Sequence, residues 1–200
     1  MVSIGDLHPV DTTRPSLLIR IRDHGDAAAW ATFDQIYRPM LYRFARSRGL
    51  GHEDAEDVVQ HCMSAVHEHI GRFDYDPDKG RFKAWLRTMV DNRIANLHRG
   101  RKDQQAESRD FRRVQERETP PDEEFEKIWM QEHLWHCLRE LRSEVEEKTY
   151  LAFEHYVIKQ WPVDQVAREL GMSANHVYTI KWRMTERVSA KMKTLLDGAT

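Results

Sequence analysis

The sequence predicts an all-α fold made of two small helical domains. Apolar residues recur at helical spacing along most of the 200-residue chain, and no alternating pattern of any length indicates a strand. The nine glycines and seven prolines are few for a β-protein with many turns. A charged segment with few apolar residues interrupts the helical pattern at 103–126 and therefore separates two domains.

Composition narrows the class of protein. Hydrophobic residues make up 40% of the chain and charged residues 32%, with a mean hydropathy of −0.75. No apolar run approaches the ~18 residues of a membrane span, and the first residues do not resemble a secretory signal. The two cysteines, Cys62 and Cys137, exclude a disulfide framework. We therefore expect a cytoplasmic protein that does not engage a membrane.

The net charge of −2 arises from a short part of the chain. Residues 1–102 carry 16 basic and 14 acidic side chains, net +2, and residues 127–200 carry 11 and 10, net +1. Residues 103–126 carry 4 and 9, net −5. We therefore expect an N-terminal tail at 1–15, a first domain at 16–102, an acidic linker at 103–126 and a second domain at 127–200. Each helical domain therefore has a small positive net charge, which is compatible with binding nucleic acid.

The first domain is predicted to contain four helices. A short helix after Pro15 ends near Gly25, and Asp26 is an N-cap for a second helix that Pro39 bends or restarts. A strongly amphipathic helix follows over 55–70. After a polar loop at 74–80, a fourth helix over 82–97 runs into the basic residues 99–102.

The second domain is predicted to end in a helix-turn-helix motif over 162–184. Helices over 128–141 and 145–157 precede it. Gly171 suits a left-handed turn and Ser173 suits an N-cap, so the next helix is placed to enter a DNA major groove. Its exposed face carries groups that hydrogen-bond bases or bind phosphates: Asn175, His176, Tyr178, Thr179, Lys181, Trp182 and Arg183. An ordinary αα-hairpin with a polar face is the alternative.

Two other segments have both a functional and a purely structural interpretation. The helix over 82–97 combines cations, Asn92 and Asn96 with nearby Trp85, which suits melted nucleic acid, but a solvated basic helix is the simpler interpretation. Four carboxylates open the helix over 55–70, between Glu53 and Asp57. They suit either a docking face for a basic partner or simple stabilisation by the helix dipole.

Enzyme and metal motifs are absent from the sequence. It contains no phosphate-binding glycine loop, no nucleophile elbow and no paired-histidine zinc motif. The histidines gather near each cysteine, at 61–69 and 133–137, but both cysteines lie on apolar helix faces as core thiols do. We therefore expect no enzyme activity, no catalytic residues, no cofactor and no metal.

Three segments in this order resemble bacterial RNA polymerase sigma factors of the extracytoplasmic-function (ECF) group. The stretch Asp54-Ala55-Glu56-Asp57-Val58-Val59-Gln60 resembles the family's helix that docks on core polymerase. Residues 80–86, Gly-Arg-Phe-Lys-Ala-Trp-Leu, resemble its F-R-x-W-L segment, and residues 162–184 resemble its region-four helix-turn-helix. The resemblance extends over about 17–195.

The resemblance implies a sigma factor that binds core RNA polymerase and directs promoter-specific initiation of transcription. Residues 16–102 would be region two and residues 127–200 region four, with the β′ clamp coiled coil, the β flap, promoter DNA and an anti-sigma factor as candidate partners. The implied contacts with core polymerase are Asp54, Glu56, Asp57, Val58 and Gln60. The implied contacts with the melted −10 element are Tyr75, Lys79, Arg81, Trp85, Arg87, Asn92, Arg93 and Asn96. The implied contacts with the −35 element are Ser173, Asn175, His176, Tyr178, Thr179, Lys181, Arg183 and Arg187.

Two other functions stay open at this point. A stand-alone helix-turn-helix regulator would use its N-terminal helices for a ligand or a second subunit, and it would not bind core polymerase. A small all-α metalloenzyme would use the histidines and would carry metal. For the sigma factor, we expect Asp57→Lys to abolish binding to core polymerase without disturbing the fold.

Overall fold

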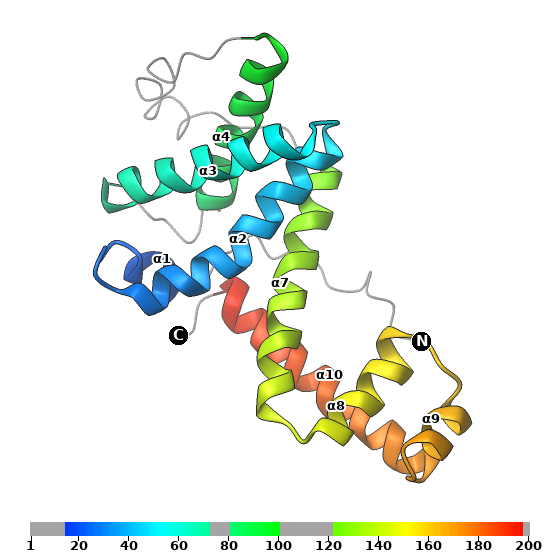
Figure 1. Ribbon diagram of the computed structural model, residues 1–200. Coiled ribbons are helices and arrows are strands. Elements are labelled where there is room, and N and C mark those ends of the chain that lie inside the picture. Colours follow the sequence, from blue (N-terminus) through cyan, green and yellow to red (C-terminus); the bar gives the residue numbers. More distant parts are fainter. Residues whose placement is uncertain (1–14, 73–80, 101–121, 198–200) are drawn as a thin grey trace. The chain divides into compact units, whose positions relative to one another are not determined.

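The computed structural model describes residues 15–72, 81–100 and 122–197, without the side chains of residues 15, 16, 81, 196 and 197. All secondary structure within these ranges is helical, which confirms the predicted all-α class. The chain divides into two compact units, Met1–Glu132 with Thr194–Thr200, and His133–Lys193. The division falls inside the long helix α7, Glu123–Glu144 (Figure 1). None of the described helices combines the length and apolarity needed to cross a membrane.

The first two helices begin where the sequence predicts them. Helix α1, Pro15–Arg20, leads through a turn to α2, Ala27–Ser47. The Asp26 carboxylate accepts a hydrogen bond from the backbone N–H of Ala29 at 2.9 Å, as an N-cap does. Arg20 donates two bonds to the same carboxylate, at 2.8 and 2.9 Å, which joins α1 to the start of α2.

Pro39 does not restart α2. The helix continues through it for eight further residues, to Ser47. A proline inside a helix removes one backbone hydrogen bond and costs about 3 kcal/mol. Buried side chains on both sides of Pro39, including Tyr37 and Met40, keep the helix against the core, so tertiary burial outweighs the local penalty.

Helices α3, His52–His69, and α4, Arg81–His98, complete the core of the first unit with α2. A short 3₁₀ turn, Ile70–Arg72, follows α3. The centre of this core is aromatic. Tyr37 and Phe82 have ring centroids 5.5 Å apart, and Phe82 and Trp85 5.6 Å apart, both with the edge of one ring toward the other.

Helix α7 begins at Glu123, five residues before the helix over 128–141 that the sequence predicts. Asp122 caps it by accepting a bond from the backbone N–H of Phe125 at 3.1 Å. Phe125 and Trp129 are 0% and 1% exposed, and their rings lie 5.0 Å from Phe44 and 5.5 Å from Tyr37. Burial of these two aromatic rings explains why so acidic a segment is helical and belongs to the first unit.

Ion pairs reinforce the contact of α7 with α2 and α4. Arg43 of α2 lies 2.8 Å from the buried carboxylate of Glu132. Lys83 of α4 pairs with Glu126 and also lies over the Trp129 ring, 5.6 Å from its centroid. Carboxylates of α7 therefore neutralise cations of α2 and α4.

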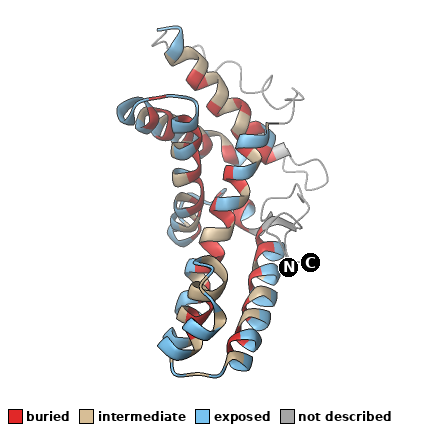
Figure 2. Ribbon diagram, turned by 90° about the vertical axis from the view of Figure 1, so that its right-hand side faces the viewer, coloured by how far each residue is buried: buried red, intermediate tan, exposed pale blue. Residues whose placement is uncertain are grey.

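The second unit contains the C-terminal half of α7, then α8, Glu147–Phe153, and a π-helical turn, Glu154–Ile158, where one continuous helix was predicted. Helices α9, Val163–Glu169, and α10, Ala174–Asp197, follow. Buried and exposed residues succeed one another along the helices (Figure 2), and on α10 the buried positions include Val177, Ile180, Met184 and Val188. This spacing is that of an amphipathic helix with one free face.

We expect Trp129→Ala to lower the free energy of unfolding of the first unit by about 3–5 kcal/mol, because it removes a buried indole and leaves a cavity. Equilibrium unfolding in guanidinium chloride, followed by circular dichroism, measures the change. The matched control is Trp182→Ala, which removes an indole that is 66% exposed and should change stability by less than about 0.5 kcal/mol. Equal effects of the two substitutions would show that α7 contributes no core contact.

Candidate functional sites

The start of α3 presents an acidic face to solvent. Asp54, Glu56 and Gln60 are exposed, and Asp57 is half-exposed. The N-cap residue, Gly51, has no side chain that could accept a hydrogen bond from the first turn. The carboxylates of Glu53 and Asp54 in that turn stabilise the positive end of the helix dipole instead. The remaining expected contact, Val58, is 0% exposed and packs inside the first unit. The polar residues can therefore meet a basic partner, while Val58 positions the helix.

Asp57 has a structural partner. Its carboxylate accepts bonds from Arg93 Nη2 at 2.6 Å and from Arg93 Nε at 3.2 Å. The Arg93 side chain is 5% exposed, and a buried guanidinium is costly unless a carboxylate compensates it. Arg93, expected to contact the −10 element, therefore joins α4 to α3 in this structure. Asp57→Lys would place a second cation beside it, so this substitution would not leave the fold undisturbed.

The other expected −10 residues differ in how far they are exposed. Trp85 is 1% exposed and packs against Phe82, so its ring is not available for stacking on a base in this conformation. Asn92 and Asn96 are half-buried, and the Asn96 side-chain oxygen accepts a bond from Arg99 at 2.9 Å. Arg81 is the first residue of α4, without a described side chain, and Tyr75 and Lys79 lie outside the described residues.

Arg87 belongs to a cluster of opposite charges at the side of α4. It lies 3.5 Å from Asp91 and 3.6 Å from Asp122, and Asp122 also pairs with Arg48. Burial raises the pKa of Asp91, and the positive charges of Arg87 and Arg48 offset only part of this effect. The cluster links α4 to the start of α7, so Arg87 has intramolecular partners where a contact with DNA was expected.

The helix-turn-helix forms as the sequence predicts. Gly171 has a φ of +56°, the left-handed conformation expected for this turn. Ser173 then caps α10: its Oγ accepts a bond from the backbone N–H of His176 at 3.2 Å, and its carbonyl accepts one from Val177 at 3.1 Å. These bonds fix where α10 begins, and thereby which of its side chains face solvent.

Most of the expected −35 residues lie on the exposed side of α10 or at its cap. Lys181 is half-buried, with Nζ 5.7 Å from the centre of the Tyr156 ring, and the others are exposed: Ser173, Asn175, His176, Tyr178, Thr179, Arg183 and Arg187. Tyr178 is also held by Tyr156, with centroids 5.7 Å apart. One end of the second unit therefore gathers amide, hydroxyl, aromatic and cationic groups on a single face.

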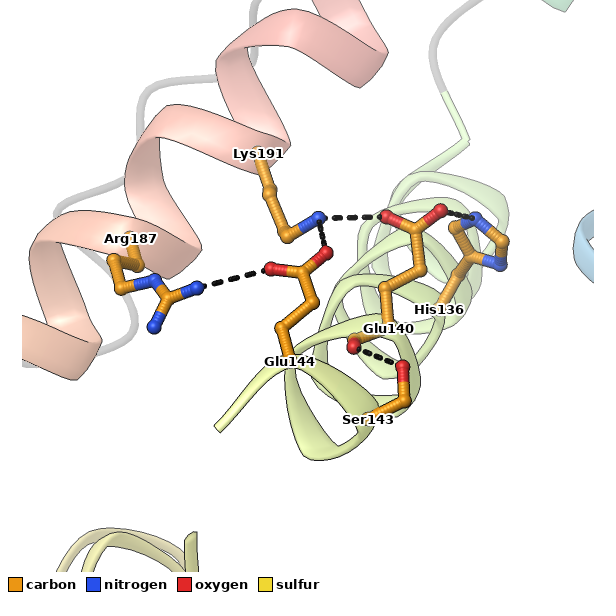
Figure 3. A network of polar contacts seen from close by, with 6 residues as sticks. All are labelled: His136, Glu140, Ser143, Glu144, Arg187 and Lys191. Atoms are coloured by element: carbon orange, nitrogen blue, oxygen red, sulfur yellow. Dashed lines mark hydrogen bonds and ion pairs between the residues drawn. The ribbon is translucent and has the colours of Figure 1, made fainter. Parts of the chain in front are cut away.

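Arg187 belongs to a separate network of charges. It donates a bond to Glu144 of α7 at 3.0 Å, and Lys191 bonds Glu144 at 2.7 Å and Glu140 at 3.1 Å (Figure 3). The hydrogen bond from Lys191 is the main cause that lowers the pKa of Glu144 below its usual value, and the charges of Lys191 and Arg187 add to it. Partial burial lowers the pKa of Lys191, but Glu144 and Glu140 outweigh it and leave that pKa raised. Arg187 thus fastens α10 to α7.

The histidines do not form a metal site in the part of the chain that the structure describes. No group of three or more His, Cys, Asp or Glu side chains is placed there to hold a metal ion. Cys62 and Cys137 are 0% and 1% exposed and are not joined in a disulfide. They lie in the cores of separate units, as their positions on apolar helix faces predicted.

Comparisons with known proteins match the first unit. The model of sigma-70 region 2 matches residues 34–104. The curated "ECF RNA polymerase sigma factor RpoE" of Cereibacter sphaeroides is 34% identical over 97 residues, which are 48% of this chain and 51% of that protein. This part of the chain is therefore similar to region 2 of the sigma factors and to an ECF sigma factor. The matched stretch spans about half the length of this curated relative.

A solved structure, "Structure of CnrH in complex with the cytosolic domain of CnrY", is also similar to this chain. The match covers 90% of this chain and 96% of that chain, with 22% identity and a TM-score of 0.36. A likeness at this TM-score does not define how the parts of the chain are arranged. The family model ends at residue 104, so the helix-turn-helix of this chain is assigned from its own geometry.

The network around Glu144 predicts a dependence of stability on pH. Because the pKa of Glu144 is lowered in the folded protein, its contribution is present above its ordinary pKa of 4.5 and is lost as the pH falls through the folded value. We expect Glu144→Gln to be less stable than the wild type at pH 7, and this difference to shrink once the pH falls below 4.5. Unfolding of both proteins across a pH series measures it, with Glu147→Gln as the control. A difference that is constant with pH would contradict the role of the ionised carboxylate.

Proposed function

We propose that this protein is an ECF sigma factor, which binds core RNA polymerase and directs initiation of transcription at specific promoters. The observation that carries the proposal is the presence, in one chain, of a sigma-70 region 2 domain and a helix-turn-helix whose second helix is solvent-exposed. A stand-alone regulator would not need a region 2 domain. The first unit would bind polymerase and melted DNA, and the second unit would bind duplex DNA upstream.

The acidic face of α3 would dock on the β′ clamp coiled coil. Asp54, Glu56 and Gln60 are exposed on one short stretch of helix, and Val58 and the Asp57–Arg93 pair hold that stretch against the core. Charges of one sign on a rigid helix steer a partner of opposite charge and fix its register. The β′ surface would supply the basic residues.

The opened −10 element would be captured beside α4. Asn92 and Asn96 lie one turn apart on this helix and offer amide groups to the edges of unpaired bases. The buried Trp85 supports this helix from inside the first unit. We therefore assign Asn92 and Asn96 the base contacts, and Tyr75, Lys79 and Arg81 the contacts that precede α4 in the chain.

The −35 element would be read in the major groove by α10. Asn175 and His176 lie in its first turn, where a recognition helix contacts base edges, and Lys181 and Arg183 follow within reach of phosphates. The same unit would dock on the β flap. The acidic segment 103–126, with a net charge of −5, extends into the first turn of α7 and repels DNA, so binding of the isolated sigma factor to a promoter is expected to be weak.

We expect Glu56→Lys to weaken binding to core polymerase at least tenfold, because it puts a cation where a basic surface must approach. Fluorescence anisotropy of the labelled sigma factor, titrated with purified core polymerase, measures the affinity. The control is Glu68→Lys, the same charge reversal at an exposed residue in the last turn of α3. Equal affinities of the two variants would remove the acidic face from the docking site. Absence of any binding by the wild type would contradict the proposed function.

We expect Lys181→Ala and Arg183→Ala to weaken promoter binding by the polymerase complex. A lost base contact costs about 1–3 kcal/mol and relaxes specificity, whereas a lost phosphate contact lowers the slope of log affinity against log salt by about one. Titrations of promoter DNA at several salt concentrations separate the two cases. Lys193→Ala removes an exposed cation further along the same helix and serves as the control. Wild-type affinity of both variants would exclude this helix from the DNA interface.

A further inference from the structure

Two of the largest exposed apolar side chains lie on the helix that we propose to enter DNA. Trp182 is 66% exposed and Tyr178 is 47% exposed, and the other large exposed apolar side chain among the described residues is Ile19 of α1. Residues four apart lie on the same face of a helix, one turn after the other. Trp and Tyr side chains are enriched at interfaces, and here two of them lie exposed side by side, so the pair indicates an apolar surface that a partner covers.

The groups around Trp182 favour an anionic partner. Lys181 and Arg183 flank it in sequence, and Asn175 and Thr179 lie on the same face toward the start of α10. The Tyr178 ring is held by Tyr156 at 5.7 Å, which reduces its freedom before any partner binds. Cations and amides around an aromatic pair are suited to the phosphates and base edges of duplex DNA.

Trp182 lies far enough along α10 to meet other base pairs than the residues of the first turn do. It is the ninth residue of the helix, which begins at Ala174. At 1.5 Å per residue it lies about 12 Å along the axis from Ala174, and the major groove is wide enough to admit a helix. Asn175 and His176 would therefore contact bases at one end of the contacted stretch, and Trp182 would contact bases further along the groove.

We propose that Trp182 is a further specificity-determining residue, whose indole contacts thymine C5-methyl groups in the −35 element. The thymine methyl is the apolar group on a base edge in the major groove. Lys181 and Arg183, which flank Trp182, would bind the neighbouring phosphates. Tyr178 extends the same apolar surface by one turn. This inference rests on the proposed reading of duplex DNA by α10 and adds a preference for thymine at particular positions.

The test compares thymine with uracil, which lacks only the methyl group. Polymerase complexes of the wild type first select duplexes from a library with a randomised upstream element, and each thymine of the selected element is then replaced singly by uracil. Loss of one buried methyl should weaken wild-type binding roughly three- to fourfold at each contacted position. Trp182→Ala should bind the thymine and uracil duplexes equally, whereas Trp182→Phe, which keeps an apolar ring, should retain part of the difference.

Two controls accompany the measurement. Ile19→Ala removes an exposed apolar side chain from the first unit and should keep the full wild-type difference between thymine and uracil. Uracil outside the selected element should have no effect on any variant. Titration with core polymerase alone should give Trp182→Ala and the wild type the same affinity, and circular dichroism should show the same helix content.

Three results would overturn the inference. If Trp182→Ala distinguishes thymine from uracil as the wild type does, the indole does not contact the methyl groups, although the proposed function stands. If Trp182→Ala binds core polymerase more weakly without DNA, the aromatic pair is a protein-docking surface. If wild-type complexes bind core polymerase but select no upstream element, the proposed role of α10 fails together with the role of Trp182.

Discussion

The ion pair between Asp57 and Arg93 is the contact on which the first unit depends. A buried guanidinium without a counter-charge costs several kcal/mol, so Asp57 of α3 stabilises Arg93 in its buried position on α4. The pair therefore fixes the register of α4 against α3. It also fixes the position of the acidic face of α3 relative to Asn92 and Asn96 of α4. One carboxylate thereby connects the surface proposed for polymerase with the surface proposed for melted DNA.

Ion pairs within the chain leave few cations that could attract DNA over a distance. Cations in the first unit pair with carboxylates at the start of α7, as Lys83 does with Glu126, and Lys191 of the second unit pairs with Glu140 and Glu144. Paired charges contribute little to the field at a distance. The exposed cations that remain on α10, such as Arg183, act at short range only. In the proposed function, such a surface would discriminate among DNA sequences after core polymerase has brought it to the promoter.

Local signals in the sequence predicted the parts that depend on neighbouring residues. Asp26 and Ser173 cap their helices, and Gly171 adopts the left-handed conformation, because caps and turns are decided within a few residues. Pro39 and the start of α7 were predicted less well. There, burial of aromatic rings from distant segments outweighs local preference, and no local pattern reveals which rings will meet.

In the candidate sites, too, the sequence predicted what depends on neighbouring residues and not what depends on tertiary contacts. The acidic face of α3 and the exposed polar face of α10 follow from helical periodicity, which separates buried from exposed positions. The partners of cations do not follow from it: Arg93, Arg87 and Arg187 were each expected at DNA, and each lies beside a carboxylate. An arginine on a helix offers the same donors to a phosphate and to a carboxylate, so only the tertiary structure decides between them.

The positions of the two cysteines bear on how the protein responds to oxidants. Cys62 and Cys137 are almost completely buried, in separate units, and oxidation of a thiol requires access of the reagent to its thiolate. Peroxide or a thiol-specific dye would therefore reach either sulfur only after local unfolding. In practice, a cysteine introduced at a surface position would be the first to react, so the native protein is already suited to site-specific labelling of its two units.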